Sequence, residues 1–169
     1  MKNIILIGFM GSGKTSVGAE IAALTGLKLE DIDARIVKDA GMPISEIFSK
    51  FGEERFRKLE TQAAKKVSAM KGRVISTGGG IVTRPENLPV LKSGGTVVYL
   101  KNSFAVSKRR LAGKKDRPLF DSGNLGKTRA LFKSRLKLYE KASDVTVVTD
   151  KKTVEQAAKE AIKKAGGQA

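Results

Sequence analysis

The glycine-rich stretch at residues 8–15 constrains the fold more than any other part of the chain. Its sequence is Gly-Phe-Met-Gly-Ser-Gly-Lys-Thr, and it directly follows residues 3–7, a short apolar run typical of a buried parallel strand. After the glycines, apolar residues recur at helical spacing and predict a helix that ends before Gly26. The sequence therefore predicts a strand, a tight loop and a helix in immediate succession.

The spacing G-x-x-x-x-G-K-T matches the phosphate-binding loop of nucleotide-binding proteins. Glycines allow backbone amide groups to approach phosphate oxygens, and the start of the following helix favours negative charge there. We expect Lys14 to contact the β and γ phosphates and the Thr15 hydroxyl to ligate Mg²⁺. A chance match is the alternative, but the flanking strand and helix favour a site for a nucleoside triphosphate.

The length and composition indicate one domain that spans residues 1–169, with 40% apolar residues available for a core. Cysteine is absent, which excludes disulfides and thiolate metal sites and leads us to expect a reducing cytoplasm. Since the predicted first strand starts near residue 3 and no apolar run is long enough to cross a membrane, we expect neither a leader nor membrane association. Histidine is also absent, so a proton acceptor must be a carboxylate, a lysine or water.

The chain is strongly basic, with 33 Lys and Arg against 17 Asp and Glu and a formal charge of +16. Such an excess indicates either a nucleic-acid partner or a pocket for two anionic small molecules. Aromatic residues make up only 5% of the chain and do not alternate with the cations, so we favour small anions and expect no specific nucleic-acid partner. Nonspecific polyanion binding stays open as a side property, and we expect a monomer.

Two aspartates, Asp31 and Asp33, lie at the end of the second predicted strand, which covers residues 27–31, and just after it. If Asp31 and Asp33 are both extended, they point to the same side; if Asp33 opens a helix, it turns toward a different ligand. The alternative is that Asp33 only caps a helix over residues 34–40. Next to a phosphate loop, we favour an Asp31 linked to Mg²⁺ and an Asp33 that faces the substrate.

A helix is predicted from residue 53 to about residue 70, after a break at Gly52. Its inward stripe is expected to consist of four apolar residues, namely Phe56, Leu59, Ala63 and Val67. Arg57 lies next to this stripe, with Glu53 and Glu60 about one turn away on either side. The pattern fits an exposed ion pair, or an Arg57 that binds a substrate carboxylate while Glu60 holds its guanidinium group.

Three consecutive glycines, Gly78, Gly79 and Gly80, follow a third predicted strand at residues 74–76. They fit either a flexible loop or a close approach to a ligand, and we favour the ligand because the strand ends at the same edge as residue 8. An interrupted helix at residues 82–93, a strand at 96–100 and a helix at 103–112 are expected next. Residues 113–123 lack apolar periodicity and predict a cationic surface loop, a lid or a disordered segment, in which Arg117 would face the transferred phosphate.

The helix predicted at residues 125–142 carries a charge among its inward residues. The apolar and small members of this stripe are expected to be Thr128, Leu131, Phe132, Leu138 and Tyr139. Arg135 falls within the stripe, so it must form an internal ion pair or face a ligand cavity, and we favour the ligand. A strand at residues 145–148 and a helix from residue 154 complete the chain.

The ordered set of motifs resembles the shikimate kinase family of phosphate-loop proteins. The motifs that carry the resemblance are G-F-M-G-S-G-K-T at 8–15, D-I-D at 31–33, G-E-x-x-F-R-x-x-E at 52–60, S-T-G-G-G at 76–80, R-P-L at 117–119 and the pair Arg135-x-x-x-Tyr139. The resemblance extends from residue 1 to about residue 153. The first motif is shared by many enzymes, whereas the ordered set is much more discriminating.

The resemblance implies a three-layer α/β/α fold of the P-loop NTPase type, with a five-stranded parallel sheet in the order 2-3-1-4-5. It also implies phosphorylation of the shikimate 3-hydroxyl by ATP with Mg²⁺, which yields shikimate 3-phosphate and ADP. A helical segment at about residues 32–61 would bind the acceptor, and residues 113–123 would form the lid.

The same resemblance assigns roles to individual residues. Asp33, Lys14 and Arg117 would act in catalysis, with Asp33 holding the reacting hydroxyl. The ATP-binding residues would be Gly11, Ser12, Gly13, Lys14, Thr15, Ser16, Arg110 and Arg117, with Arg110 covering the adenine. The shikimate-binding residues would be Asp33, Arg57, Gly78, Gly79, Gly80 and Arg135. The metal-binding residues would be Thr15 and, through water, Asp31. Val154 departs from the proline found in some relatives near the base.

Overall fold

A parallel β-sheet forms the centre of the protein in this computed structural model, which describes residues 2–112 and 124–166. The five strands of this described part are Asn3–Ile7 (β1), Lys28–Asp31 (β2), Arg73–Ser76 (β3), Gly95–Lys101 (β4) and Val145–Val148 (β5). Their order is β2-β3-β1-β4-β5, and each neighbouring pair is parallel. The predicted fold is confirmed. The predicted lid at 113–123, with Arg117, lies outside the described residues.

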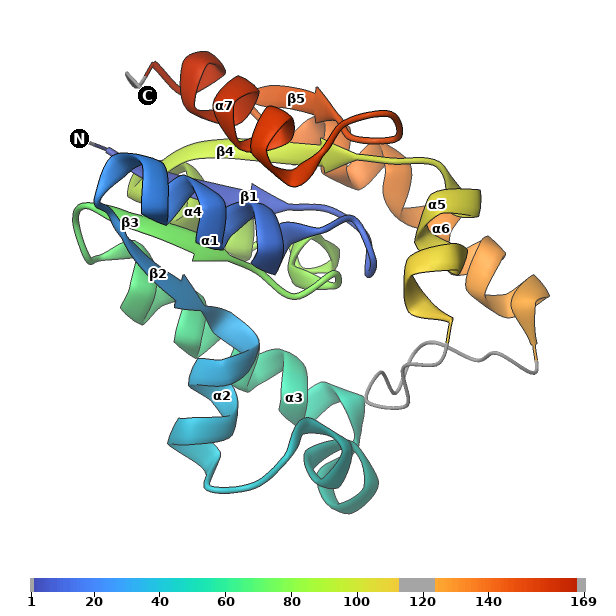
Figure 1. Cartoon of the computed structure of the whole chain (residues 1–169). Coiled ribbons are helices and arrows are strands. Elements are labelled where there is room, and N and C mark those ends of the chain that lie inside the picture. The colour runs from blue at the N-terminus through green and yellow to red at the C-terminus, as the bar shows by residue number, and fades with distance from the viewer. Residues whose placement is uncertain (1, 113–123, 167–169) are drawn as a thin grey trace.

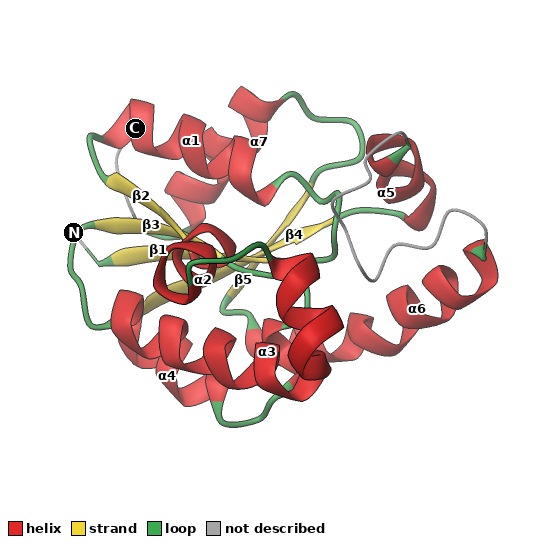
Figure 2. Cartoon of the chain, turned by 90° about the horizontal axis from the view of Figure 1, so that it is seen from below, coloured by secondary structure: helices red, strands yellow, loops and turns green. Residues whose placement is uncertain are grey.

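Helices cover both faces of the sheet (Figures 1 and 2). One face carries Lys14–Thr25 (α1) and Val154–Lys164 (α7), and the other carries Ile44–Ser68 (α3), Asn87–Gly94 (α4) and Leu125–Ala142 (α6). The remaining elements are Ile32–Ala40 (α2), the short 3-10 helix Ile81–Thr83 (η1) and Phe104–Leu111 (α5). Figure 1 shows α2 and the first part of α3 projecting beyond the sheet. Within the described residues, no helix is long and apolar enough to cross a membrane.

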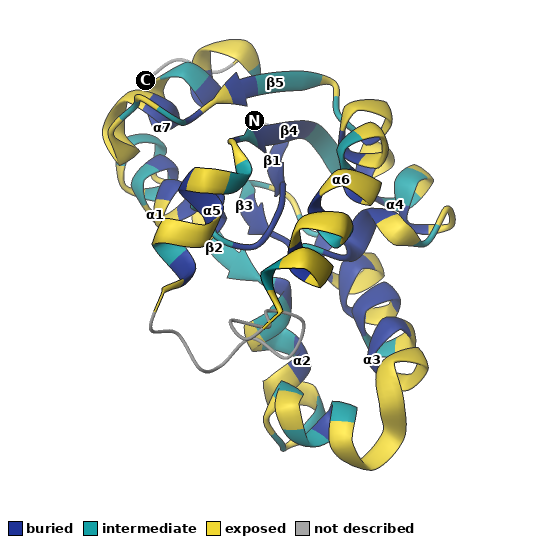
Figure 3. Cartoon of the chain, turned by 90° about the vertical axis from the view of Figure 1, so that its right-hand side faces the viewer, coloured by how far each residue is buried: buried dark blue, intermediate teal, exposed yellow. Residues whose placement is uncertain are grey.

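The apolar sequence of β1 follows from its central position. All five of its residues are buried. Ile4 and Leu6 belong to the cluster beneath α1 and α7, whereas Ile5 and Ile7 belong to the cluster beneath α3, α4 and α6. Figure 3 shows β1 as buried, the edge strands β2 and β5 as largely of intermediate exposure, and the projecting part of α3 as largely exposed. A strand covered on both faces needs apolar residues at every position, which explains the uninterrupted run.

The loops after β1 and β3 lie side by side because the two strands pair directly. Thr77 fixes their relative position, since its backbone amide and its hydroxyl both donate to the Leu6 carbonyl, at 3.2 and 2.9 Å. The predicted phosphate loop and the predicted run of three glycines are therefore neighbours at the carboxyl edge of the sheet.

One alternative that we did not favour and one local prediction are wrong. The helix expected at residues 34–40 begins at Ile32, and its N-cap is Asp31, whose side chain accepts a hydrogen bond from the Ala34 amide at 3.2 Å. Asp33 is therefore not the cap. Leu138 is 37% exposed, because it lies about 100° from the buried Tyr139 around α6 and faces solvent.

Two other local predictions are confirmed. Gly52 breaks the regular helix within α3, with φ 76° and ψ 172°. The interrupted helix expected at residues 82–93 consists of η1 and α4 as two separate elements.

Candidate active site

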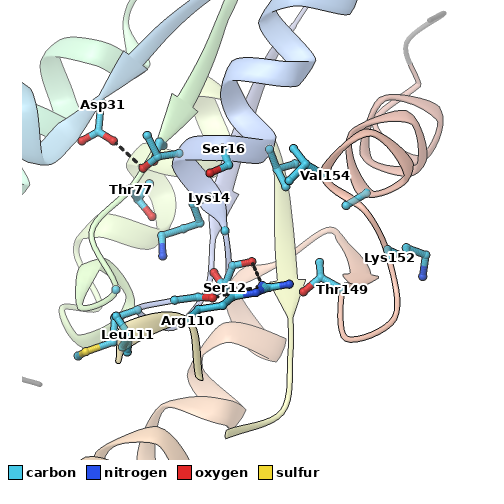
Figure 4. Close-up of a pocket in the computed structure, with 18 of the residues that line it drawn as sticks. Ser12, Lys14, Ser16, Asp31, Thr77, Arg110, Leu111, Thr149, Lys152 and Val154 are labelled. Atoms are coloured by element: carbon cyan, nitrogen blue, oxygen red, sulfur yellow. Dashed lines mark hydrogen bonds between the residues drawn. The ribbon is translucent and has the colours of Figure 1, made fainter. Parts of the chain in front are cut away.

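The phosphate loop at residues 8–15 lines a cleft of about 340 Å³ at the carboxyl edge of the sheet (Figure 4). Every ATP-binding residue predicted within the described part contributes to the lining, namely Gly11, Ser12, Gly13, Lys14, Thr15, Ser16 and Arg110. Asp33 and Gly79 also line this cleft, whereas Arg57 and Arg135 do not. The cleft therefore extends from the loop toward the predicted acceptor residues.

The conformation of the loop explains two of its glycines. Gly11 has φ 78° and Gly13 has φ 95°, in the left-handed region that side chains rarely adopt. A Cβ atom at Gly11 would also lie only 3.0 Å from the Ser107 carbonyl oxygen of α5. Gly13 is the N-cap of α1, so this helix starts within the loop and directs its first amides toward the cleft.

Lys14 folds back over the phosphate loop. Its ammonium group donates to the carbonyl oxygens of Gly8, at 2.8 Å, and Phe9, at 3.0 Å. Figure 4 shows the side chain within the cleft, and the residue is only 8% exposed. A cation beside the free amides at the start of a helix is suited to bind phosphate oxygens.

Three oxygen-bearing side chains meet beside the loop. The Thr15 hydroxyl donates to Asp31 Oδ2 at 3.2 Å and lies 3.4 Å from the Ser76 hydroxyl. All three residues line the cleft. Mg²⁺ prefers oxygen ligands and is held in phosphate-transfer sites by one or two protein groups together with phosphate and water. The donor set therefore fits the magnesium ion predicted for this position.

Arg110 forms the side of the cleft at α5. Its Nη1 atom donates to the carbonyl oxygens of Gly11 and Ser12, both at 3.2 Å. Figure 4 also shows Thr149 and Lys152, from the segment that joins β5 to α7, and Val154, the first residue of α7. The predicted base pocket near Arg110 and Val154 thus has walls from two distant segments.

The glycine loop, residues 78–80, contacts the three predicted acceptor side chains. A Cβ atom at Gly78 would lie 2.9 Å from Asp33 Oδ1, and one at Gly80 would lie 2.1 Å from Arg57 Nη1. Arg135 donates through Nη1 to the Gly79 carbonyl oxygen at 3.3 Å. The structure therefore brings residues from α2, α3 and α6 together around one short loop.

Arg57 is a buried cation. It is 5% exposed, and its guanidinium group contacts Glu60 Oε2 at 2.8 Å and Glu53 Oε1 at 2.9 Å. The alternative of an exposed ion pair is wrong. Burial acts to lower the pKa of Arg57, but the two glutamates outweigh burial and raise it. The guanidinium group therefore stays charged, and Glu60 holds it in one orientation as the sequence predicted.

Arg135 has no carboxylate within ion-pair distance among the described residues, although it is only 4% exposed. Its Nε atom is buried and lacks a hydrogen-bond partner in the described part of the chain, as does Glu60 Oε1. Buried polar groups normally have partners, so these two atoms indicate a ligand that supplies them. The internal ion pair considered for Arg135 is not found in this part of the structure.

Comparison with known proteins identifies the family, because the family model described as shikimate kinase matches residues 10–165. The chain belongs to the shikimate kinase family. A shikimate kinase from Thermodesulfovibrio yellowstonii is 46% identical over 164 residues, which covers 96% of this chain and 94% of that relative.

Solved structures of shikimate kinases have the same fold. The shikimate kinase from Acinetobacter baumannii in complex with shikimate gives a TM-score of 0.91 at 37% identity, covering 95% of this chain and 90% of that one. The shikimate kinase from Aquifex aeolicus gives a TM-score of 0.84 at 38% identity, covering 96% of this chain and 95% of that one. The resemblance inferred from the motifs is therefore confirmed.

Several residues that line the cleft of this shikimate kinase family member were missed by the sequence analysis. They are Met10, Ser76, Thr77, Thr149, Lys152, Thr153 and Ala157. Ser76 is the last residue of β3 and Thr149 directly follows β5, so their places at the carboxyl edge of a parallel sheet were a usable signal. The sequence offers no comparable signal for Lys152, which lies four residues after the end of β5. Its approach to the cleft depends on the path of the segment before α7.

We expect Glu60 to make the stability of this shikimate kinase family member decrease as pH rises. Burial raises the pKa of Glu60; Arg57 opposes this effect and Asp33 adds to it. A carboxyl whose pKa is raised by folding stabilises the folded state below its unfolded pKa, and this contribution is lost as pH rises through the folded pKa.

Urea unfolding of the wild type and Glu60→Gln between pH 4 and pH 8 measures this effect. The free energy of unfolding of the wild type, relative to that of Glu60→Gln, should decrease by about 1.4 kcal/mol for each pH unit between the unfolded-state and folded-state pKa values of Glu60. If the relative stability of the wild type instead grew with pH, the contact of Glu60 with Arg57 would outweigh the effect of burial on the pKa of Glu60.

Proposed function

We propose that the chain transfers the γ-phosphoryl group of ATP to the 3-hydroxyl of shikimate, with shikimate 3-phosphate and ADP as products. Membership of the shikimate kinase family supports the reaction. The observation that carries the proposal is the glycine loop, which brings Asp33 and the buried cations Arg57 and Arg135 together beside the phosphate loop. Shikimate offers one carboxylate and three hydroxyl groups, so its charge and polarity match this set.

On the donor side, we propose that the phosphate loop amides and Lys14 bind the β and γ phosphates of ATP. Lys14 would exchange the Gly8 and Phe9 carbonyls for phosphate oxygens, which carry full negative charge and accept stronger hydrogen bonds. Thr15 and, through water, Asp31 would hold Mg²⁺. When bound, Mg²⁺ supplies neutralisation of phosphate charge.

On the acceptor side, Asp33 would orient the reacting hydroxyl and accept its proton. Its position in the first turn of α2 directs it into the cleft. Arg57 and Arg135 would bind the carboxylate, and their burial makes these hydrogen bonds stronger than on the surface. Phosphoryl transfer depends mainly on positioning and charge stabilisation, so the absence of histidine from the sequence is no obstacle.

Other parts of the proposal rest on the family resemblance. Residues 32–61 would form the acceptor-binding segment of a single domain, and residues 113–123 would form a lid that brings Arg117 to the phosphates. Arg110 would cover the adenine, with Val154 in the lining of the same cleft. We further propose a cytoplasmic monomer, since a chain without cysteine suits a reducing compartment.

Gly80→Ala is expected to raise the KM for shikimate at least tenfold. The added Cβ would overlap the Arg57 guanidinium group, 2.1 Å away, and displace it from Glu60. The backbone itself tolerates alanine, because Gly80 has φ −97°. Gly126→Ala is the matched control, since its Cβ would meet no atom of the described residues closer than 3.4 Å. Steady-state kinetics should show a normal KM for the control; an equal KM in both variants would contradict the packing described here.

Two other functions are tested by the same assay. A gluconate or nucleotide kinase would use a different acceptor, and a nucleotide-dependent nucleic-acid binder would use the +16 charge. A neutral polyol would leave two buried arginines without a carboxylate. A nucleotide acceptor would need a pocket for its base, and none is found beside the acceptor residues in the described part of the chain.

A coupled assay of ADP release with shikimate, gluconate and AMP as acceptors distinguishes these functions. We expect release that requires shikimate, ATP and Mg²⁺ together. Release with another acceptor but not with shikimate would overturn the proposal. Tight, salt-sensitive oligonucleotide binding without any acceptor-dependent release would favour the nucleic-acid binder.

A further inference from the structure

Two side chains of α6 donate to the same backbone oxygen. The Tyr139 hydroxyl lies 2.5 Å from the Gly79 carbonyl oxygen, and Arg135 Nη1 lies 3.3 Å from it. Tyr139 is fully buried, and it stands one helical turn after Arg135. The shorter of the two contacts to the Gly79 carbonyl is therefore made by a residue that has no role in the proposed reaction so far.

Gly79 lies directly against the phosphate loop. A Cβ atom at this position would be 3.2 Å from the Met10 amide nitrogen and 3.6 Å from the Gly8 carbonyl oxygen. The backbones of the two loops are thus in contact with no side chain between them. A displacement of the Gly79 peptide would change the spacing between the nucleotide side and the acceptor side of the cleft.

The Tyr139 ring is held by its surroundings. It stacks on Tyr99 of β4, with ring centroids 5.1 Å apart and an interplanar angle of 25°. Tyr99 in turn pairs with Ile7, the last residue before the phosphate loop. Burial raises the pKa of the Tyr139 hydroxyl above its usual range, so it remains a donor at any pH at which the enzyme works.

We propose that Tyr139 is a positioning residue, whose hydroxyl holds the Gly79 carbonyl and thereby keeps Arg135 available for the acceptor carboxylate. Without this hydroxyl, Arg135 is the remaining side-chain donor to Gly79 in the described structure, and its guanidinium group is drawn toward the loop and away from the substrate. A buried carbonyl that loses a donor favours the remaining one, because an unsatisfied buried oxygen is costly. The inference rests on the proposed function, since it concerns the same acceptor.

Tyr139→Phe tests this role, because it removes one oxygen atom and leaves the ring in place. We expect the KM for shikimate to rise about three- to tenfold, in line with the loss of one hydrogen bond. The KM for ATP and kcat should each change by less than about twofold, since the phosphate loop keeps its own contacts. KM does not depend on how much of the enzyme is folded, so a loss of stability alone would not produce this pattern.

Tyr99→Phe is the matched control. It removes a hydroxyl from the other member of the same stacked pair, and that hydroxyl makes no bond to the glycine loop among the described residues. We expect Tyr99→Phe to retain the wild-type KM for shikimate. Hydrogen exchange adds a structural measurement: amides of residues 78–81 should exchange faster in Tyr139→Phe than in Tyr99→Phe.

The outcomes separate the inference from the function on which it rests. A wild-type enzyme that releases no ADP with shikimate would overturn both. An active wild type, together with a Tyr139→Phe variant that matches Tyr99→Phe in KM and in exchange, would overturn the positioning role alone. A Tyr139→Phe variant that loses kcat and binds both substrates normally would also contradict it.

Discussion

Asp33→Asn is expected to lower kcat about 100- to 10,000-fold, the usual contribution of a positioned general base. Asparagine keeps the shape of the side chain and its place beside Gly78, but it cannot accept the proton of the reacting hydroxyl. The affinity for ATP should change little, since the donor contacts come from the phosphate loop. Steady-state kinetics and calorimetric titration with ATP measure the two quantities separately.

Asp39→Asn provides the control for this variant. Asp39 belongs to the same helix, α2, but contacts Arg35 and Lys66 at the surface. The control therefore removes an equal charge from the same element without touching the cleft, and its kcat should match the wild type. Normal turnover by Asp33→Asn would show that the proton leaves by another route, for example directly to the phosphate.

Lys14→Met is expected to lower kcat about 100- to 1,000-fold, as the loss of one charge-stabilising donor usually does. Methionine has a similar length, so the loop keeps its packing but loses the ammonium group that contacts Gly8 and Phe9. Turnover with saturating ATP and shikimate measures the loss, and calorimetry with ATP measures the accompanying loss of affinity.

Lys159→Met is the matched control for overall charge. Lys159 lies on the exposed side of α7 and pairs with Glu155 at 2.7 Å. Both variants remove one positive charge from a chain of +16, so any effect of net charge on the approach of ATP appears in both. If the two variants behaved alike, the direct contact of Lys14 with phosphate would have to be abandoned.

The sequence predicted the elements of the fold closely, because local patterns determine them. The run before the phosphate loop has no polar residue after Asn3, as a strand covered on both faces requires. The predicted helix boundaries were less accurate. The helix α2 starts two residues before the predicted residue 34, because Asp31, rather than Asp33, accepts a hydrogen bond from its first turn. Capping depends on which of two nearby carboxylates has the extended backbone, and the residue types alone do not decide that.

The candidate site was predicted as a set of residues, but not as an arrangement. The spacing of Arg57 and Glu60 indicated a pair, whereas the burial of Arg57 depends on contacts with Gly80, which is distant in sequence. The three glycines were expected to allow a ligand to approach closely. The structure shows a further reason for them, since side chains of Asp33, Arg57 and Glu60 occupy the space that Cβ atoms would take at Gly78 and Gly80.

The packing of the glycine loop also limits how such an enzyme can acquire a new acceptor. Removing Arg57 alone would leave Glu60 buried without its counter-ion, and enlarging Gly80 alone would collide with Arg57. Changes at these positions are therefore coupled, and each single step costs stability before a second step restores it. Redesign of acceptor specificity on this scaffold should exchange the arginine, the glutamate and the facing glycine together.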